Sequence, residues 1–99
     1  MIRHIVAWNL IATDPAERTS AFEELKAKIE GLVGVVPGLR SANVARDIGN
    51  ASGNWDVVLI SEHDDEEALA VYQQHPEHVV VAGFTRSVTK DRVCVDVQV

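Results

Sequence analysis

The side chains best suited to chemistry in this sequence lie close together, in the stretch Tyr72-Gln-Gln-His-Pro-Glu-His78. This stretch holds the only tyrosine of the chain and two of its four histidines. A histidine with an unperturbed pKa, about 6.5, takes up and returns a proton near neutral pH. Removal of a proton next to a carbonyl group requires such a base, together with a donor to the developing enolate. We therefore expect His78 to be the general base and the Tyr72 hydroxyl to be the donor.

A structural interpretation of the same two side chains stays open. In that interpretation His78 caps or bridges backbone groups at a corner of the fold, and Tyr72 packs in the core with one hydrogen bond. Well-placed titratable residues often have only this structural role.

A break between two helices is expected to aim these two rings. The segment before Tyr72 is predicted to be helical, because Asp64 or Asp65 can cap it and its acidic first turn suits the positive end of the helix dipole. Pro76 lacks an N–H and disfavours α geometry at His75, so this helix should end there and a second, short helix can begin. A rigid bend of this kind can point both rings into a cavity.

Two further histidines have a structural and a functional interpretation. His4 alternates with Val6 and Trp8 on one face of a predicted strand, so it is either a satisfied core residue or a partner that orients His78. His75 lies at a predicted helix end, and helix capping is its expected role.

A metal site is not expected, because zinc or iron requires three or four ligands that converge at fixed distances. Pro76 separates His75 from His78, so these two need not share a helix face. His63 is predicted at a strand end, facing solvent. Cys94 lacks the neighbouring cysteine or basic cluster that marks a reactive thiol. We expect neither a metal nor a cofactor.

A pocket for a substrate can form between the predicted sheet and helices, although plain core is the alternative because 99 residues leave little interior to hollow out. Leu25 and Phe84 are further candidates for its wall. The expected pocket residues are Val6, Trp8, Phe22, Leu59 and Val81.

The positions of these residues depend on a predicted β-α-β-β-α-β order, the ferredoxin-like α+β pattern, in one domain over residues 1–99. Asp14 and Pro15 form a strong helix start before a stripe of apolar residues at three- and four-residue steps. Strands are expected over residues 2–11, 41–48, 55–61 and 88–99, and helices from residues 13 and 65.

The first and third strands, which are central in this pattern, are apolar on both faces. Helices on one side of the sheet leave the other face bare, and such a patch is larger than a soluble monomer normally leaves open. A symmetric homodimer with the two sheets face to face removes it. The alternation along the last strand does not decide whether Val93, Val95 and Val97 lie on the bare face or on the face toward the helices. The bare face is expected to hold Ile5, Ala7, Ile11, Val58 and Ile60.

The composition excludes several classes of partner. The net charge is −6 with no basic cluster, which argues against nucleic acid and anionic membrane surfaces. The single cysteine excludes an internal disulfide and suits a reducing compartment. No run reaches the roughly 18 apolar residues of a membrane span, so the expected location is cytoplasmic.

Taken together, several motifs resemble those of the stress-responsive dimeric A/B-barrel family (Dabb), over essentially the whole chain. The resemblance implies a ferredoxin-like protomer and a homodimer whose two sheets close into a barrel. The motifs are Ile2-Arg-His-Ile-Val6, Val36-Pro-Gly-Leu-Arg40, Trp55-Asp56, Ser61-Glu-His-Asp-Asp-Glu-Glu-Ala-Leu69, Tyr72-Gln-Gln-His-Pro-Glu-His78 and Asp91-Arg-Val-Cys-Val-Asp96.

One plant branch of this family comprises polyketide cyclases of the olivetolic acid type, which close a linear polyketide by aldol chemistry without cofactor or metal. By motif position, the resemblance places the working residues of that branch at Tyr72, His78 and His4. Val57 stands where the cyclases have a further histidine, and Thr89 and Val81 stand where they have bulky aromatic residues. The acid–base pair is thus kept and the pocket shape is not, so the cyclase's substrate does not carry over.

These observations lead to one expected function and two alternatives. The expected function is a cofactor-free enzyme with aldol- or cyclase-like acid–base chemistry on a small carbonyl compound. The first alternative is a non-catalytic, stress-related module that binds a small hydrophobic ligand. The second is a cofactor-independent monooxygenase, since similar barrels host that chemistry.

Overall fold

The computed structural model describes all 99 residues as four strands and three helices. The order is β-α-β-β-α-α-β, a ferredoxin-like α+β fold, as the sequence predicts apart from the length of the sixth element. The elements are β1 (Ile2–Leu10), α1 (Pro15–Glu30), β2 (Leu39–Arg46), β3 (Val57–His63), α2 (Glu66–Gln74), α3 (Pro76–Val88) and β4 (Thr89–Gln98).

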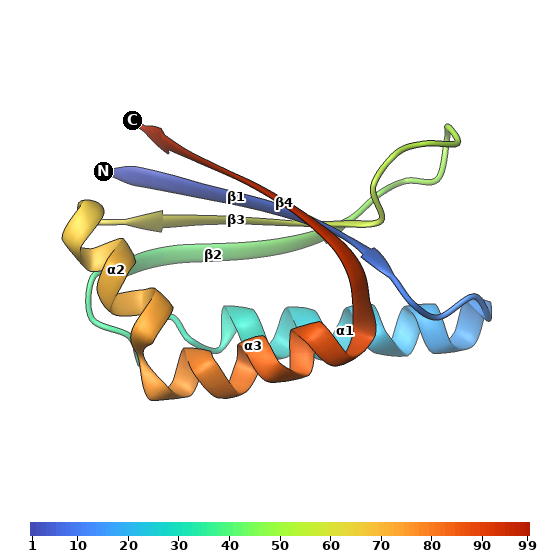
Figure 1. Ribbon diagram of the computed structural model, residues 1–99, viewed down its shortest axis with the longest axis horizontal. Coiled ribbons are helices and arrows are strands. Elements are labelled where there is room, and N and C mark those ends of the chain that lie inside the picture. The colour runs from blue at the N-terminus through green and yellow to red at the C-terminus, as the bar shows by residue number, and fades with distance from the viewer.

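The four strands form one antiparallel sheet in the order β2-β3-β1-β4. The first and third strands are therefore central, as predicted. All three helices lie on one side of this sheet, and α2 sits at the end where both chain termini are found (Figure 1). We call the face toward the helices the inner face and the opposite one the outer face.

Local capping explains where the helices begin. The Asp14 side chain accepts a hydrogen bond from the Glu17 backbone N–H, with Pro15 in the first turn of α1. Asp65, rather than Asp64, caps α2 by accepting from the Ala68 N–H. Both helix starts confirm the predicted signals.

The break at Pro76 is present, and the helix after it is longer than expected. His75 has extended backbone angles (φ −63°, ψ 133°) between the two helices, and Pro76 is the first residue of α3. The His75 Nδ1 accepts a hydrogen bond from the Glu77 N–H. His75 therefore does cap a helix, but its side chain caps the start of α3 as an acceptor rather than the end of α2 through its charge. Helix α3 continues for 13 residues because its apolar side chains, Val81 and Phe84 among them, pack against the main core.

The inner face carries the core in two clusters. The larger cluster joins Val6, Trp8 and Leu10 of β1 to Leu25 and Ile29 of α1 and to residues of β2 and β3. The smaller cluster lies toward α2 and consists of Ile2, Leu32, Val36, Leu39, Leu69 and Tyr72.

The strand register assigns the last strand to its faces. Ile5 of β1 pairs with Ile60 on one side and Val95 on the other. The alternating valines of β4 therefore belong to the outer face, which parity alone did not decide. Ile11 lies beyond the end of β1 rather than inside the patch. Three large side chains of this face are open to solvent: Ile60 at 39%, Val93 at 45% and Val95 at 57%.

No helix combines the length and the apolar character that crossing a bilayer requires.

Candidate functional site

A cavity of about 330 Å³ opens between the inner face of the sheet and the helical layer. Its wall includes the three residues expected to do chemistry, His4, Tyr72 and His78. Four of the five expected pocket residues also line it: Val6, Trp8, Leu59 and Val81.

Phe22 does not line this cavity. It packs against the edge of the main core, and the Arg46 guanidinium lies 5.7 Å from its ring centre. Leu25, a further candidate, is fully buried in the core. Sequence reasoning could not separate wall from core because both kinds of position carry the same apolar residues. The wall residues it missed are Ile29, Gln73, Val79, Ala82, Thr85, Arg86 and Arg92.

The helix break brings Tyr72 and His78 together. Tyr72 lies in the last turns of α2 and His78 in the first turn of α3, and their ring centroids are 4.1 Å apart. The Nδ1 atom of His78 is buried without a hydrogen-bond partner. Buried polar atoms rarely lack a partner, and functional sites are one place where such atoms are found.

Burial sets the protonation states of this pair. Burial lowers the pKa of His78 below 6.5, and a hydrogen bond to the Gln73 backbone opposes part of that shift. Tyr72 is 1% exposed, and burial raises its pKa to about 12. At neutral pH the imidazole is therefore neutral and able to accept a proton, while the phenol keeps its proton and can donate a hydrogen bond.

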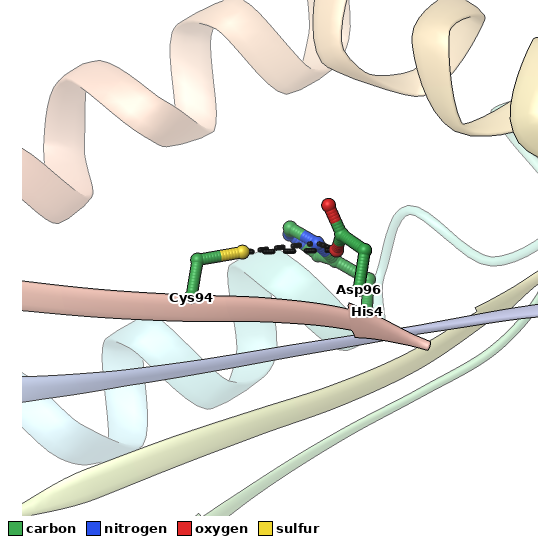
Figure 2. A group of neighbouring side chains, drawn as sticks. All are labelled: His4, Cys94 and Asp96. Carbon is green, nitrogen blue, oxygen red and sulfur yellow. Dashed lines mark hydrogen bonds and ion pairs between the residues drawn. The ribbon is translucent and has the colours of Figure 1, made fainter. Parts of the chain in front are cut away.

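His4 is oriented by the last strand. Its Nδ1 lies 2.5 Å from Asp96 Oδ1, and the two residues are direct partners in the β1–β4 register. The Cys94 thiol lies 3.5 Å from the same nitrogen, and all three side chains project from the strands toward the helices (Figure 2). Because an ionised carboxylate can only accept, Nδ1 carries the hydrogen, which leaves Nε2 of His4 for a ligand.

His63 is buried beside the site without lining the cavity, which contradicts the prediction that it faces solvent. Strand β3 runs two residues further than expected, so His63 pairs with Ile2 and Leu39 and points inward, with 0% of its surface exposed. Its ring centroid is 4.7 Å from that of Tyr72, and its Nε2 is 2.9 Å from Ser61 Oγ. The alternation of Ser61 and His63 with the outward Ile60 was the sequence signal that could have placed it.

The environment of His63 favours the neutral ring. Burial, followed by the neighbouring His4, lowers the pKa of His63 to about 4. Its Nδ1 has no hydrogen-bond partner. The ring therefore supports Tyr72 as an uncharged neighbour.

One group of side chains has the types that could hold a metal ion. Nδ1 of His4, Sγ of Cys94 and Oδ1 of Asp96 lie within 4.8 Å of one another. Two ligands of a tetrahedral zinc are about 3.3 Å apart, given bonds of about 2.0–2.1 Å. The 2.5 Å separation of His4 and Asp96 is shorter than that and fits a direct hydrogen bond. Burial and the Asp96 carboxylate also raise the pKa of the Cys94 thiol, which disfavours the thiolate that a metal would need.

The comparisons with known proteins agree with this architecture. The model of the stress responsive A/B barrel domain matches residues 2–99. A dimeric protein of unknown function with a ferredoxin-like fold from Bacteroides fragilis is 27% identical, with a TM-score of 0.88 over 99% of this chain and 95% of its own. A dimeric ferredoxin-like protein of unknown function from Thermobifida fusca is 26% identical, with a TM-score of 0.83 over 99% and 90%.

A hydroxynitrile lyase from Passiflora edulis has a TM-score of 0.80 over 97% of this chain and 90% of its own, at 13% identity. At that identity the likeness extends to the fold alone. No match was found among curated proteins.

Proposed function

The chain belongs to the stress responsive A/B barrel domain family, and we propose that its inner cavity is the active site of a cofactor-free enzyme acting on a small carbonyl compound. The observation that carries the proposal is the Tyr72–His78 pair on the wall of one cavity. It combines a neutral base with a protonated phenol, and their ring centroids are 4.1 Å apart. This arrangement suits aldol- or cyclase-like acid–base chemistry.

The proposed reaction begins with His78. Its neutral imidazole removes a proton from the carbon next to a carbonyl, and the electrons of the C–H bond form an enolate. The Tyr72 hydroxyl donates a hydrogen bond to the enolate oxygen, and its pKa of about 12 keeps the proton on the phenol. The enolate carbon attacks a second carbonyl of the same molecule, forming a carbon–carbon bond. The protonated His78 then returns its proton to the new alkoxide.

His4 has a supporting role in this proposal. Asp96 holds its Nδ1–H, so Nε2 is the nitrogen that can accept a hydrogen bond from the substrate or orient a hydroxyl. Because Asp96 sits on the neighbouring strand, the ring is held without help from the helices.

Proton exchange tests the proposal without knowledge of the natural substrate. Small ketones and 1,3-diketones in deuterium oxide should lose their α-proton NMR signal faster with the protein than without it. His78→Ala should slow the catalysed exchange by about 10²- to 10⁴-fold, the usual contribution of a general base. Tyr72→Phe should slow it by about 10-fold or more.

The matched control is His75→Ala, which removes a half-buried histidine of the same stretch that does not line the cavity. It should exchange at the wild-type rate.

The exchange rate of the wild-type protein should also depend on pH. Because burial lowers the pKa of His78, this rate should be level near pH 7 and fall only in more acidic solution, with a midpoint below 6.5. Equal rates for His78→Ala and wild type would overturn the proposal.

A non-catalytic ligand-binding module is the second candidate, favoured by the mainly apolar wall of the cavity. Such a module would bind small hydrophobic compounds and leave their α-protons in place. A cofactor-independent monooxygenase, the remaining alternative, would consume oxygen in the same assay.

We also infer that the protein works in the cytoplasm, because its single free cysteine suits a reducing compartment.

We further infer that the protein is a homodimer built through the outer face. Ile60 of β3 and Val93 and Val95 of β4 are exposed on this face, on the two strands that flank β1. A second copy covers this patch by twofold symmetry. The Bacteroides fragilis and Thermobifida fusca proteins, similar over nearly the whole chain, are both dimeric.

A further inference from the structure

Two arginines line the cavity from different elements. Arg86 lies in the last turn of α3, and Arg92 lies on β4 beside Trp8 of β1. Both side chains are exposed, which places them at the opening of the cavity rather than in its depth.

These arginines differ from most basic residues of the chain in having no acidic partner. Five of the nine lysines and arginines form ion pairs with a carboxylate: Arg3, Arg18, Lys26, Lys28 and Arg40. Arg46 bonds to the Thr19 hydroxyl and lies over Phe22. The three unpaired cations fall within seven residues at the α3–β4 junction, and two of them line the cavity. In a chain of net charge −6, this concentration marks the opening as the place where an anion is attracted.

The depth of the cavity offers no comparable charge. Eight of its fourteen lining residues are apolar, Tyr72 and His78 are neutral at pH 7, and His4 is paired with the Asp96 carboxylate, which offsets any charge on its ring. An apolar interior beneath a cationic opening suits a ligand with an apolar body and one anionic group. The planar guanidinium group matches a carboxylate in particular, with two parallel hydrogen bonds.

We propose that the cavity binds an amphipathic carboxylate, with its carboxylate at Arg86 and Arg92 and its apolar body beneath Val81 and Trp8. A cavity of about 330 Å³ lies at the small end of the ~300–1,000 Å³ range of ligand pockets, so the body is a short chain rather than a long fatty acyl tail. One further step rests on the proposed function. In that case the amphipathic carboxylate is the substrate, an oxo acid whose carbonyl lies by Tyr72 and His78.

Trp8 provides a direct probe of occupancy. It lines the cavity and is 5% exposed, and Trp55, the only other tryptophan, does not line it. In a Trp55→Phe background, all tryptophan fluorescence comes from Trp8. Octanoate and 1-octanol, which share an apolar chain and differ in charge, are titrated into this protein at pH 7.5 and low ionic strength.

Octanoate should bind at least about tenfold more tightly than 1-octanol, and high salt should reduce that ratio. Arg86→Gln/Arg92→Gln should bring the ratio close to one. The control Arg40→Gln/Arg46→Gln removes the same charge from positions that do not line the cavity and should keep the ratio. Circular dichroism verifies that each variant is folded.

Three results would overturn the proposal: no binding of either probe, equal binding of both by the parent protein, or a preference that survives in Arg86→Gln/Arg92→Gln. His78→Ala separates this proposal from the enzyme proposal, because it should lose α-proton exchange and keep the octanoate preference. A preference for octanoate without any exchange activity supports the carboxylate site and rejects the enzyme.

Discussion

The two faces of this sheet are made by the same strands and have opposite chemistry. Along β1, His4 and Val6 point to the helices, while Ile5 and Ala7 point away from them. The inner face presents His4 and His63 toward Tyr72 and His78 of the helices, and three of these four rings, all but His63, line a cavity. The outer face holds aliphatic side chains that remain exposed in the single chain. Alternation along a strand thus lets 99 residues carry a cavity wall and an exposed apolar face back to back.

The buried histidines differ in how far their ring nitrogens find hydrogen-bond partners. His4 forms a hydrogen bond with Asp96, and His63 forms one with Ser61. Two buried nitrogens, Nδ1 of His63 and Nδ1 of His78, lack partners. Each such atom costs about 1–3 kcal/mol of stability. Aliphatic groups at these positions would avoid that cost.

The largest expected effect comes from placing a charge on the outer face. Val95→Asp should weaken dimerisation by at least about 100-fold, or about 3 kcal/mol, because symmetry buries the carboxylate twice in an apolar interface. Sedimentation equilibrium at micromolar concentration measures the mass. Val80→Asp, a similarly exposed position on α3, should leave the mass at that of the dimer. If Val95→Asp and wild type have equal mass, the outer face is not the interface.

The next effect tests the neutral state of the inner face. The pKa of His63 is about 4 in the folded protein, below the value of about 6.5 expected for the unfolded chain. Between these values the unfolded chain binds more protons, so the free energy of unfolding should fall as pH drops from 6.5 to 4. The contribution of His63 is at most about 3 kcal/mol.

Urea denaturation at several pH values measures this loss. His63→Gln removes the titrating group and should flatten the dependence over that interval, leaving the part due to His78. His75→Gln, a change at a half-buried histidine outside the inner face, should keep the wild-type dependence. An unchanged slope in His63→Gln would mean that this ring titrates normally.

The smallest effect concerns the contact between Gly38 and Ala68 of α2, which sets how closely α2 packs beside the sheet. A Cβ at Gly38 would lie 2.7 Å from Ala68 Cβ of α2, and Gly38 has a φ of +82°. Gly38→Ala should therefore destabilise the fold by about 2 kcal/mol, from backbone strain together with displacement of α2. Gly34→Ala has similar strain (φ +89°) with nothing within 4 Å, and should cost about 1 kcal/mol. Equal losses in chemical denaturation would show that the helix contact contributes nothing.

Local features of the sequence were enough to determine the fold and part of the site. The caps at Asp14 and Asp65 and the break at Pro76 depend on residues within one turn of one another, so propensity and hydrogen bonding predict them. The ferredoxin-like order of the elements predicted that the first and third strands are central, and their two apolar faces agree with that position. The same local break explains how Tyr72 and His78 come to share a cavity wall.

Only the tertiary structure decided the remaining features, because they depend on pairing between strands far apart in the chain. Asp96 meets His4 across 92 residues through the β1–β4 register, which also sends the alternating valines of β4 outward. His63 is buried because β3 pairs on both sides to its last residue. Arg92 reaches the cavity opening by the same β4 register. A strand pattern of period two is unchanged by a shift of two residues and does not identify the neighbouring strand, so register and partner had to come from the fold as a whole.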